Sequence, residues 1–330
     1  MQIYIARRLM LVPVTLILVT IIVFLLARLV PGDIIDLIQS ELEASSTGES
    51  EVDRAAIERA LGLDQPIHIQ YGRWVGILPS PEKGFSGILQ GDFGTSLRKS
   101  VPVIDEVLAR LPVTFELGLL AIIIGVCISL PIGVFAAIRQ DTLADYGGRT
   151  VSILMISVPS FWIATLIMIY PSIWWGWSPR IEVIPFLQDP MGNIEIFIIP
   201  AVVMGTHMTG GSMRMMRTMM LEVMRQDYIR TAWSKGLRER VIIYRHALKN
   251  ALIPVITIIG MQLPVLLGGS VIIEQIFCLP GIGRLLIESL HQRDYPMISG
   301  INLILSAFVL LCNLAVDLTY GILDPRVRYK

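Results

Sequence analysis

The sequence has 330 residues and a formal net charge of zero, with 54% hydrophobic and only 16% charged residues. Soluble globular domains are charged at roughly a quarter of their positions, so this composition excludes an ordinary soluble domain and indicates a membrane protein. Of the three cysteines, Cys127, Cys278 and Cys312, two lie in apolar runs. We therefore expect small buried side chains and no disulfide framework.

Six apolar stretches are each close to or above the roughly 18–20 residues that a helix needs to cross a bilayer. The first is too long for the apolar part of a signal peptide and lacks a small-x-small cleavage site after it, so we expect a retained helix. The fourth is the shortest, and its helix is expected to run on into a basic segment. The six stretches are 9–27, 117–138, 151–177, 196–213, 250–273 and 295–316.

Lysine and arginine gather in four places that fall on one side of the membrane if there are six spans. Because basic loops are cytoplasmic as a rule, both termini are predicted to be cytoplasmic. The opposite segments are acidic, and Trp174, Trp175 and Trp177 cluster where the third span should leave the membrane. The basic places are Arg7 and Arg8, Arg139 and Arg149, the segment 221–254, and Arg326, Arg328 and Lys330.

The segment 31–112 is too long for a simple connection between two spans. It holds a Ser/Gly/Glu-rich tract at 40–50 and a helical candidate at 53–61, which Gly62 is well placed to end. Gly, Pro and Asp at turn-like positions follow. We expect a small extracytoplasmic cap of short helices and loops; a floppy tether is the alternative.

The segment 221–254 is the one long, strongly basic, amphipathic part of the chain. Apolar residues recur at helical spacing on both sides of Gly236, which predicts two short helices hinged at that glycine, since glycine tolerates a positive φ. Such a hairpin, continuous with the fifth span, can convert a push into a helix motion. A helix lying on anionic lipid is the alternative. The two stripes are Leu221, Met224, Tyr228 and Ala232, then Leu237, Val241, Tyr244, Leu248 and Leu252.

The run Asp227-Tyr-Ile-Arg-Thr-Ala-x-x-Lys-Gly-Leu, followed by Arg245-His-Ala-Leu-x-Asn-Ala-Leu-Ile-Pro, resembles the cytoplasmic coupling loop of bacterial ABC importer permeases. The similarity is to the dipeptide/oligopeptide/nickel branch. The wider family reads Glu-Ala-Ala-x-x-x-Gly; here the Glu is absent, and Ala232 and Gly236 are kept. Further segments resemble the same branch in order along the chain, among them GDFGTSL, RLPVTFELGLLA, VIIEQIFCLPGIGRLLIESLHQRDYP and VDLTYGILDPRVRY. The acidic tract at 40–52 and the PSPEKGFSG insertion depart from the pattern.

This resemblance implies an all-α membrane protein with six transmembrane helices, the type I ABC importer permease fold, and a helical extracytoplasmic cap between helices 1 and 2. The implied divisions are 1–112 (first helix and cap), 113–322 (permease core, coupling hairpin about 221–250) and 323–330 (cytoplasmic tail). The implied partners are a second homologous permease subunit, two cytoplasmic ABC ATPase subunits, an extracytoplasmic solute-binding protein and membrane lipid, with no nucleic acid. The implied location is the bacterial inner membrane.

The implied function is import of short peptides or related solutes, with a nickel or other small-solute importer of the same family as the alternative. In the implied mechanism of alternating access, closure of the ATPase dimer on ATP moves the hairpin and tilts the fifth helix. Gly236 would be the hinge, and Tyr228 and Leu237 the apolar knobs. The residues expected to contact the ATPase are Asp227, Tyr228, Arg230, Thr231, Ala232, Lys235, Gly236 and Leu237.

No Gly-x-x-x-x-Gly-Lys-[Ser/Thr] loop occurs, so ATP and Mg are expected in separate ATPase chains, and no cofactor, metal or catalytic residue is expected in this one. The rival readings need features that the sequence lacks: a charged or unwound mid-membrane site for a secondary transporter, or a catalytic pair within the spans for an enzyme. A scaffold would not need a hinged hairpin. His207 lies inside the fourth span, where a polar ring usually faces protein or water. Prolines in or near spans are expected to kink mobile helices: Pro13, Pro131, Pro159, Pro254 and Pro264.

Overall fold

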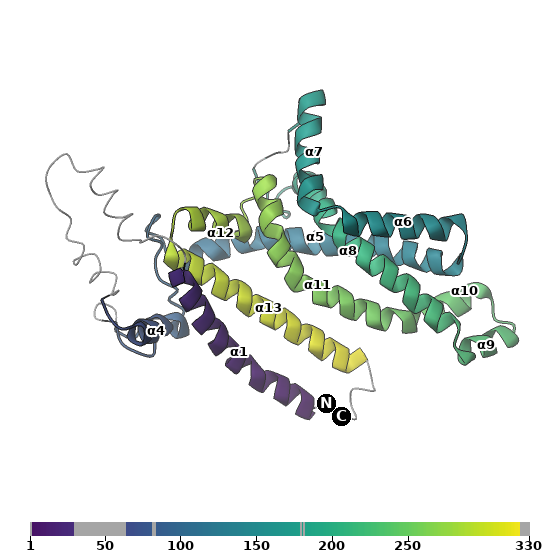
Figure 1. Ribbon diagram of the computed structural model, residues 1–330, viewed down its shortest axis with the longest axis horizontal. Coiled ribbons are helices and arrows are strands. Elements are labelled where there is room, and N and C mark those ends of the chain that lie inside the picture. Colours follow the sequence, from purple (N-terminus) through teal and green to yellow (C-terminus); the bar gives the residue numbers. More distant parts are fainter. Residues whose placement is uncertain (1, 30–63, 81–83, 179, 181, 324–330) are drawn as a thin grey trace. The chain divides into compact units, whose positions relative to one another are not determined.

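Apolar runs form the long helices of the computed structural model, which describes residues 2–29, 64–80, 84–178, 180 and 182–323 (Figure 1). Within these residues, five helices are long and apolar enough to cross a membrane, and a bent pair brings the number to six if it counts as one span. The five confirm five of the six predicted stretches. They are Arg8–Leu26, Val103–Ile138, Pro190–Met224, Glu239–Val265 and Tyr295–Thr319.

The prediction of one continuous helix over 151–177 is wrong. The chain forms α6 (Leu143–Ser157) and α7 (Ser160–Trp175), which are bent by 88° at the short break between them. Val158 and Pro159 have extended backbone, with ψ of 121° and 133°. Proline lacks an N–H and also disfavours helical geometry in the residue before it, so the first helix ends there.

Contacts between residues divide the chain into two compact units. The first comprises Met1–Ala6, Arg110–Leu285 and Phe308–Lys330; the second comprises Arg7–Ala109 and Leu286–Ala307. The first unit holds most of α5 (Val103–Ile138), then α6, α7, α8 (Pro190–Met224) and α11 (Leu248–Ile276).

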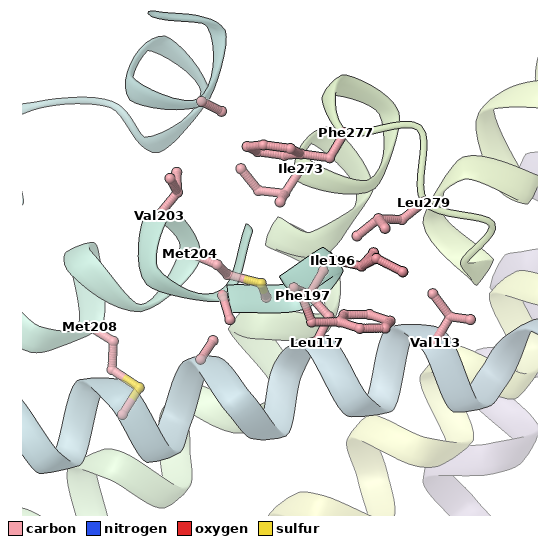
Figure 2. Packing of buried hydrophobic residues seen from close by; sticks show 13 residues of the cluster. Val113, Leu117, Ile196, Phe197, Val203, Met204, Met208, Ile273, Phe277 and Leu279 are labelled. Carbon is pink, nitrogen blue, oxygen red and sulfur yellow. The ribbon is translucent and has the colours of Figure 1, made fainter. Parts of the chain in front are cut away.

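The helix α8 is the centre of the first unit and packs against α6, α7 and α11. Phe197 and Met204 of α8 meet Leu117 of α5 and Ile273 of α11 in one buried apolar cluster, drawn in Figure 2. Gly205 allows α8 to approach α5 closely, because a Cβ at this position would lie only 2.8 Å from the Ala121 carbonyl oxygen of α5. The helix runs to Met224, which confirms that the fourth span continues into the basic segment.

The second unit is organised around α1 (Gln2–Leu29) and α4 (Ile67–Val75). Phe24 of α1 packs edge-on against Tyr71, with ring centroids 5.3 Å apart, and Thr20 shares a 2.8 Å hydrogen bond with the Tyr71 hydroxyl. The buried Asp294 carboxylate accepts hydrogen bonds from Ser96 Oγ and from the Leu97 backbone N–H. It thereby ties the loop before α5 to the turn between α12 (Ile282–His291) and α13 (Tyr295–Leu323).

The predicted cap is described only in part. Its described portion holds α4 and one short 3₁₀ helix, Ile88–Gln90, joined by loops, as expected for short helices and turns. The polar tract at 40–50, the helical candidate at 53–61 and the tail from 324 lie outside the described residues.

Candidate coupling hairpin

The basic segment forms a helical hairpin after α8. It consists of α9 (Asp227–Ser234), a turn, the short α10 (Glu239–Val241), a π-helical segment (Ile242–Ala247) and then α11. Gly236 has a φ of +74°, and its N–H donates to the Trp233 carbonyl at 2.9 Å. A Cβ at this position would meet no atom within 4 Å, so glycine is required here by the backbone rather than by space. The predicted break at Gly236 is confirmed.

One face of α9 anchors the hairpin to the end of α8. Ile229 and Ala232 are buried in a cluster with Met216 and Met220 of α8 and Ile242 of the π segment. Burying large apolar side chains of this kind contributes about 1.5–3 kcal/mol each. The cluster therefore makes α9 follow any movement of the end of α8.

The predicted apolar stripes are partly wrong. Tyr228 and Tyr244 are 44% and 61% exposed, while Ile229 and Ile243 are buried in their place. The helical phase set by α8 does not continue into α9, because the chain turns at Arg225 and Gln226 between them. The π segment shifts the phase again, since its wider turn holds more than 3.6 residues.

The opposite face of α9 and the turn is open. Seven of the eight residues expected to contact an ATPase are exposed, and Ala232 alone is buried. Trp233, which the sequence reasoning missed, is 45% exposed on the same short helix. Tyr228 is exposed, and its hydroxyl also accepts a 2.8 Å hydrogen bond from Asn250 Nδ2, which links α9 to the start of α11. The ion pair of Asp227 with Arg230 is almost fully exposed and adds little stability.

A buried charge cluster, absent from the sequence reasoning, holds α6 against α8. The Asp145 carboxylate is fully buried and accepts two hydrogen bonds from Arg217, from Nε at 2.6 Å and from the terminal nitrogen at 2.8 Å. Arg149, one turn along α6, donates to the same carboxylate at 2.6 Å and 3.2 Å. The Asp141 backbone N–H is a third partner, at 3.0 Å. The sequence signal was the i, i+4 pair of Asp145 and Arg149; the contact with Arg217 has no local signature.

A second contact fixes the same two helices further along. Ser152 Oγ of α6 donates to the Gly210 carbonyl of α8 at 2.7 Å, and a Cβ on Gly210 would lie 2.7 Å from the Ser152 carbonyl oxygen. The helices α6 and α8 are thus joined at two levels. Through the cluster at the end of α8, the hairpin, α8 and α6 form one mechanically continuous path.

The described residues contain no group of three or more His, Cys, Asp or Glu side chains that could hold a metal ion. His207 lies exposed on α8, and His246 lies in the π segment. The open face of the described hairpin carries basic, aromatic and apolar side chains.

The comparisons with known proteins cover the chain from end to end. A family model described as "Binding-protein-dependent transport system inner membrane component" matches residues 129–329, and the N-terminal model of the same transport-system membrane components matches residues 1–118. Among solved structures, an amino acid ABC transporter crystallised with histidines is similar with a TM-score of 0.48 and 15% identity, over 68% of this chain and 94% of that one.

Curated relatives are similar over almost their full length. The oligopeptide transport system permease protein AppB of Bacillus subtilis is 38% identical, with 100% of both chains covered. The dipeptide transport system permease protein DppB of Escherichia coli K12 is 35% identical, with 99% of both covered. A peptide transport system permease protein of Brucella abortus, provisionally so named, is 42% identical over 96% of each chain.

Proposed function

We propose a specific role for this chain, which belongs to the family of binding-protein-dependent transport system inner membrane components. As a member of that family it is a multi-pass inner-membrane permease, a transport subunit rather than an enzyme, and it works with ATPase and binding-protein partners. We propose that it forms half of the pathway by which short peptides are imported. The peptide assignment rests on the names of the full-length relatives, which are oligopeptide and dipeptide permeases.

The proposed arrangement has six spans, with α6 and α7 together as one bent span. This count puts the N-terminus, the turn before α6, the hairpin and the C-terminus on one side. Arginine and lysine concentrate at those four places, which supports a cytoplasmic location for all of them. The segment between α1 and α5 then forms the extracytoplasmic cap, where a solute-binding protein would dock. A second homologous permease would complete the pathway.

Two cytoplasmic ATPase subunits are proposed to bind the permease pair, one at each hairpin. The observation that carries this proposal is the division of α9 into two faces: Ile229 and Ala232 are buried against α8, while Tyr228, Arg230 and Trp233 are exposed on a platform of basic residues. An anchored helix with an exposed aromatic and basic face suits a protein partner, because aromatic and arginine side chains dominate binding energies. ATP and Mg would be bound by the partner chains.

In the proposed mechanism, closure of the ATPase dimer on ATP displaces α9. Since α9 is packed on the end of α8, and α8 is joined to α6 through Asp145 and Ser152, the displacement reaches three helices. The expected tilt of the fifth helix, α11, is therefore one part of the stroke. Gly236 and the π segment between hairpin and α11 supply the local freedom that the stroke requires.

The test is to purify the tagged complex and measure ATPase co-purification, peptide-stimulated ATP hydrolysis and peptide uptake in vesicles. Trp233→Ala and Tyr228→Ala should each weaken ATPase binding, with a loss of about 1–3 kcal/mol that corresponds to roughly 5- to 150-fold in affinity. Leu143→Ala is the matched control, because Leu143 is 91% exposed at the start of α6, on the same proposed side.

Normal ATPase binding by both hairpin variants, or equal loss in the control, would refute the docking face. Retained ATPase coupling with no uptake of any peptide would refute the peptide assignment and would leave the docking face unaffected. The nickel alternative is not proposed, because the full-length relatives named above are peptide permeases.

A further inference from the structure

The C-terminal half of α8 carries a line of polar residues that the coupling role does not use. His207, Gly211, Arg214 and Thr218 follow one another at i, i+4, i+7 and i+11 and so share one face of the helix. His207, Arg214 and Thr218 are exposed, and Gly211 is partly exposed. At 1.5 Å per residue the line is about 17 Å long. Gln262 of α11 widens it, since its Nε2 lies 4.0 Å from the Cβ position of Gly211.

This polar stripe, defined by His207, Gly211, Arg214 and Thr218, is the open face of a helix that is otherwise packed. Met208, Met213 and Met216, which lie on other faces of the same turns, are buried. Two-thirds of the most apolar part of α8 is buried within the chain. The exposed residues of its N-terminal half, such as Ile198 and Val202, lie on roughly the opposite side of the helix. The change from an apolar to a polar open face therefore occurs within one spanning helix.

The exposed face of α5 is apolar at the level of His207, where the stripe begins. The level is set by Gly205 of α8, whose Cβ position lies 2.8 Å from the Ala121 carbonyl oxygen, and by Gly125, whose Cβ position lies 3.3 Å from Met208. At this level α5 exposes a line at i, i+4 spacing that suits a lipid environment. It consists of Phe115, Leu119, Ile123 and Cys127.

A polar stripe at this depth is costly in hydrocarbon. His207 lies inside the fourth apolar stretch, 196–213, and Arg214 directly follows it. A charged side chain costs about 2.5–3.5 kcal/mol at the centre of a spanning helix on insertion scales and less toward its end, and polar residues within spans face protein or water-filled cavities. No ion pair within the described part of the chain occupies the Arg214 guanidinium. Its position on an open face leaves its donors available to a ligand.

We propose that the polar stripe lines the water-filled part of the translocation pathway and that Arg214 receives the C-terminal carboxylate of the passing peptide. This inference rests on the proposed function and names residues of the chain that would line the pathway and bind the peptide. A guanidinium binds a carboxylate through two parallel hydrogen bonds, which suits a group shared by all peptides whatever their side chains. His207 and Gln262 supply hydrogen-bonding groups beside it, which hold a polar backbone without fixing its sequence.

The first experiment measures water access. In a cysteine-free variant of the complex, His207→Cys and Ile123→Cys are compared, because both positions lie at the same depth on open helix faces. A charged, water-soluble methanethiosulfonate reagent reacts with the thiolate that forms in water, so we expect labelling at position 207 to be about ten-fold faster or more. Peptide should slow this labelling. Equal resistance of both cysteines with and without ATP would overturn the water-lined stripe.

The second experiment tests the carboxylate. Arg214→Gln should raise the peptide concentration for half-maximal uptake about ten-fold or more, and Arg214→Lys should do so less. The same loss should not appear with C-terminally amidated peptides. Arg139→Gln, at an exposed arginine just after α5 and outside the hairpin, is the matched control. An equal effect on free and amidated peptides would overturn the carboxylate role. Labelling at position 207 in a complex that takes up no peptide would overturn the substrate class and keep the water-lined stripe.

Discussion

The buried carboxylate of Asp145 offers a quantitative test of how α6 is held to α8. Asp145→Ala leaves Arg217 and Arg149 facing each other without the anion that now accepts from both. Removing one partner of a buried ion pair costs about 3–5 kcal/mol, because the remaining charge is left uncompensated. At roughly 2–4 °C per kcal/mol for a chain of this order of size, the apparent unfolding temperature should fall by about 6–20 °C.

The assay is the temperature at which half of the detergent-solubilised complex is lost from its monodisperse chromatographic peak. Asp141→Asn is the control: Asp141 contacts the same Arg149 at 3.5 Å but is 63% exposed, and exposed pairs contribute about 1 kcal/mol or less. Asparagine also tolerates the φ of 60° that the backbone adopts at this position. The double variant Asp145→Leu with Arg217→Met should be more stable than Asp145→Ala, since a well-packed apolar pair is often as stable as a buried ion pair. Equal melting of Asp145→Ala and Asp141→Asn would refute the reasoning.

Three further predictions concern glycine geometry and a second buried carboxylate. Gly236→Asn should keep ATPase coupling and uptake and Gly236→Val should lose them, because asparagine tolerates a positive φ and a β-branched residue does not; equal uptake would remove the backbone explanation. Gly205→Ala should lower stability by about 1–3 kcal/mol through overpacking, whereas Gly118→Ala, with open space around its Cβ, should not; thermal melting compares them. Glu274→Ala should destabilise more than Glu274→Gln, since the amide retains an acceptor for Thr114 Oγ1, now 2.7 Å away; the reverse order of melting temperatures would contradict this.

Local signals in the sequence were sufficient for the spans and for the break in the hairpin. Apolar length alone located five long helices, and Gly236 marked the turn because no other residue adopts its backbone geometry as easily. The continuation of α8 into the basic segment could be predicted because the fourth apolar stretch is the shortest of the six. These features depend on neighbours within a few residues, which a single sequence contains.

Features that depend on distant residues could not be obtained in this way. Asp145 and Arg217 are 72 residues apart, and neither carries a local sign of the other. The bend at Pro159 was expected only as a kink, since a proline in a span can bend a helix slightly or end it according to its surroundings. The anchoring face of α9 was missed because a turn at Arg225 and Gln226 and a π segment each reset the helical phase.

The π segment Ile242–Ala247 has a geometrical consequence for everything that follows it. A π turn accommodates one more residue than the α-helical turn it interrupts, and one residue corresponds to about 100° of rotation and 1.5 Å of rise. If the wide turn relaxed to α geometry while the hairpin stayed fixed, α11 would rotate about its own axis by that angle. A screw-like rotation of this kind would exchange the face that α11 presents to α8, with few backbone hydrogen bonds changed and a shift of only about 1.5 Å along the helix axis.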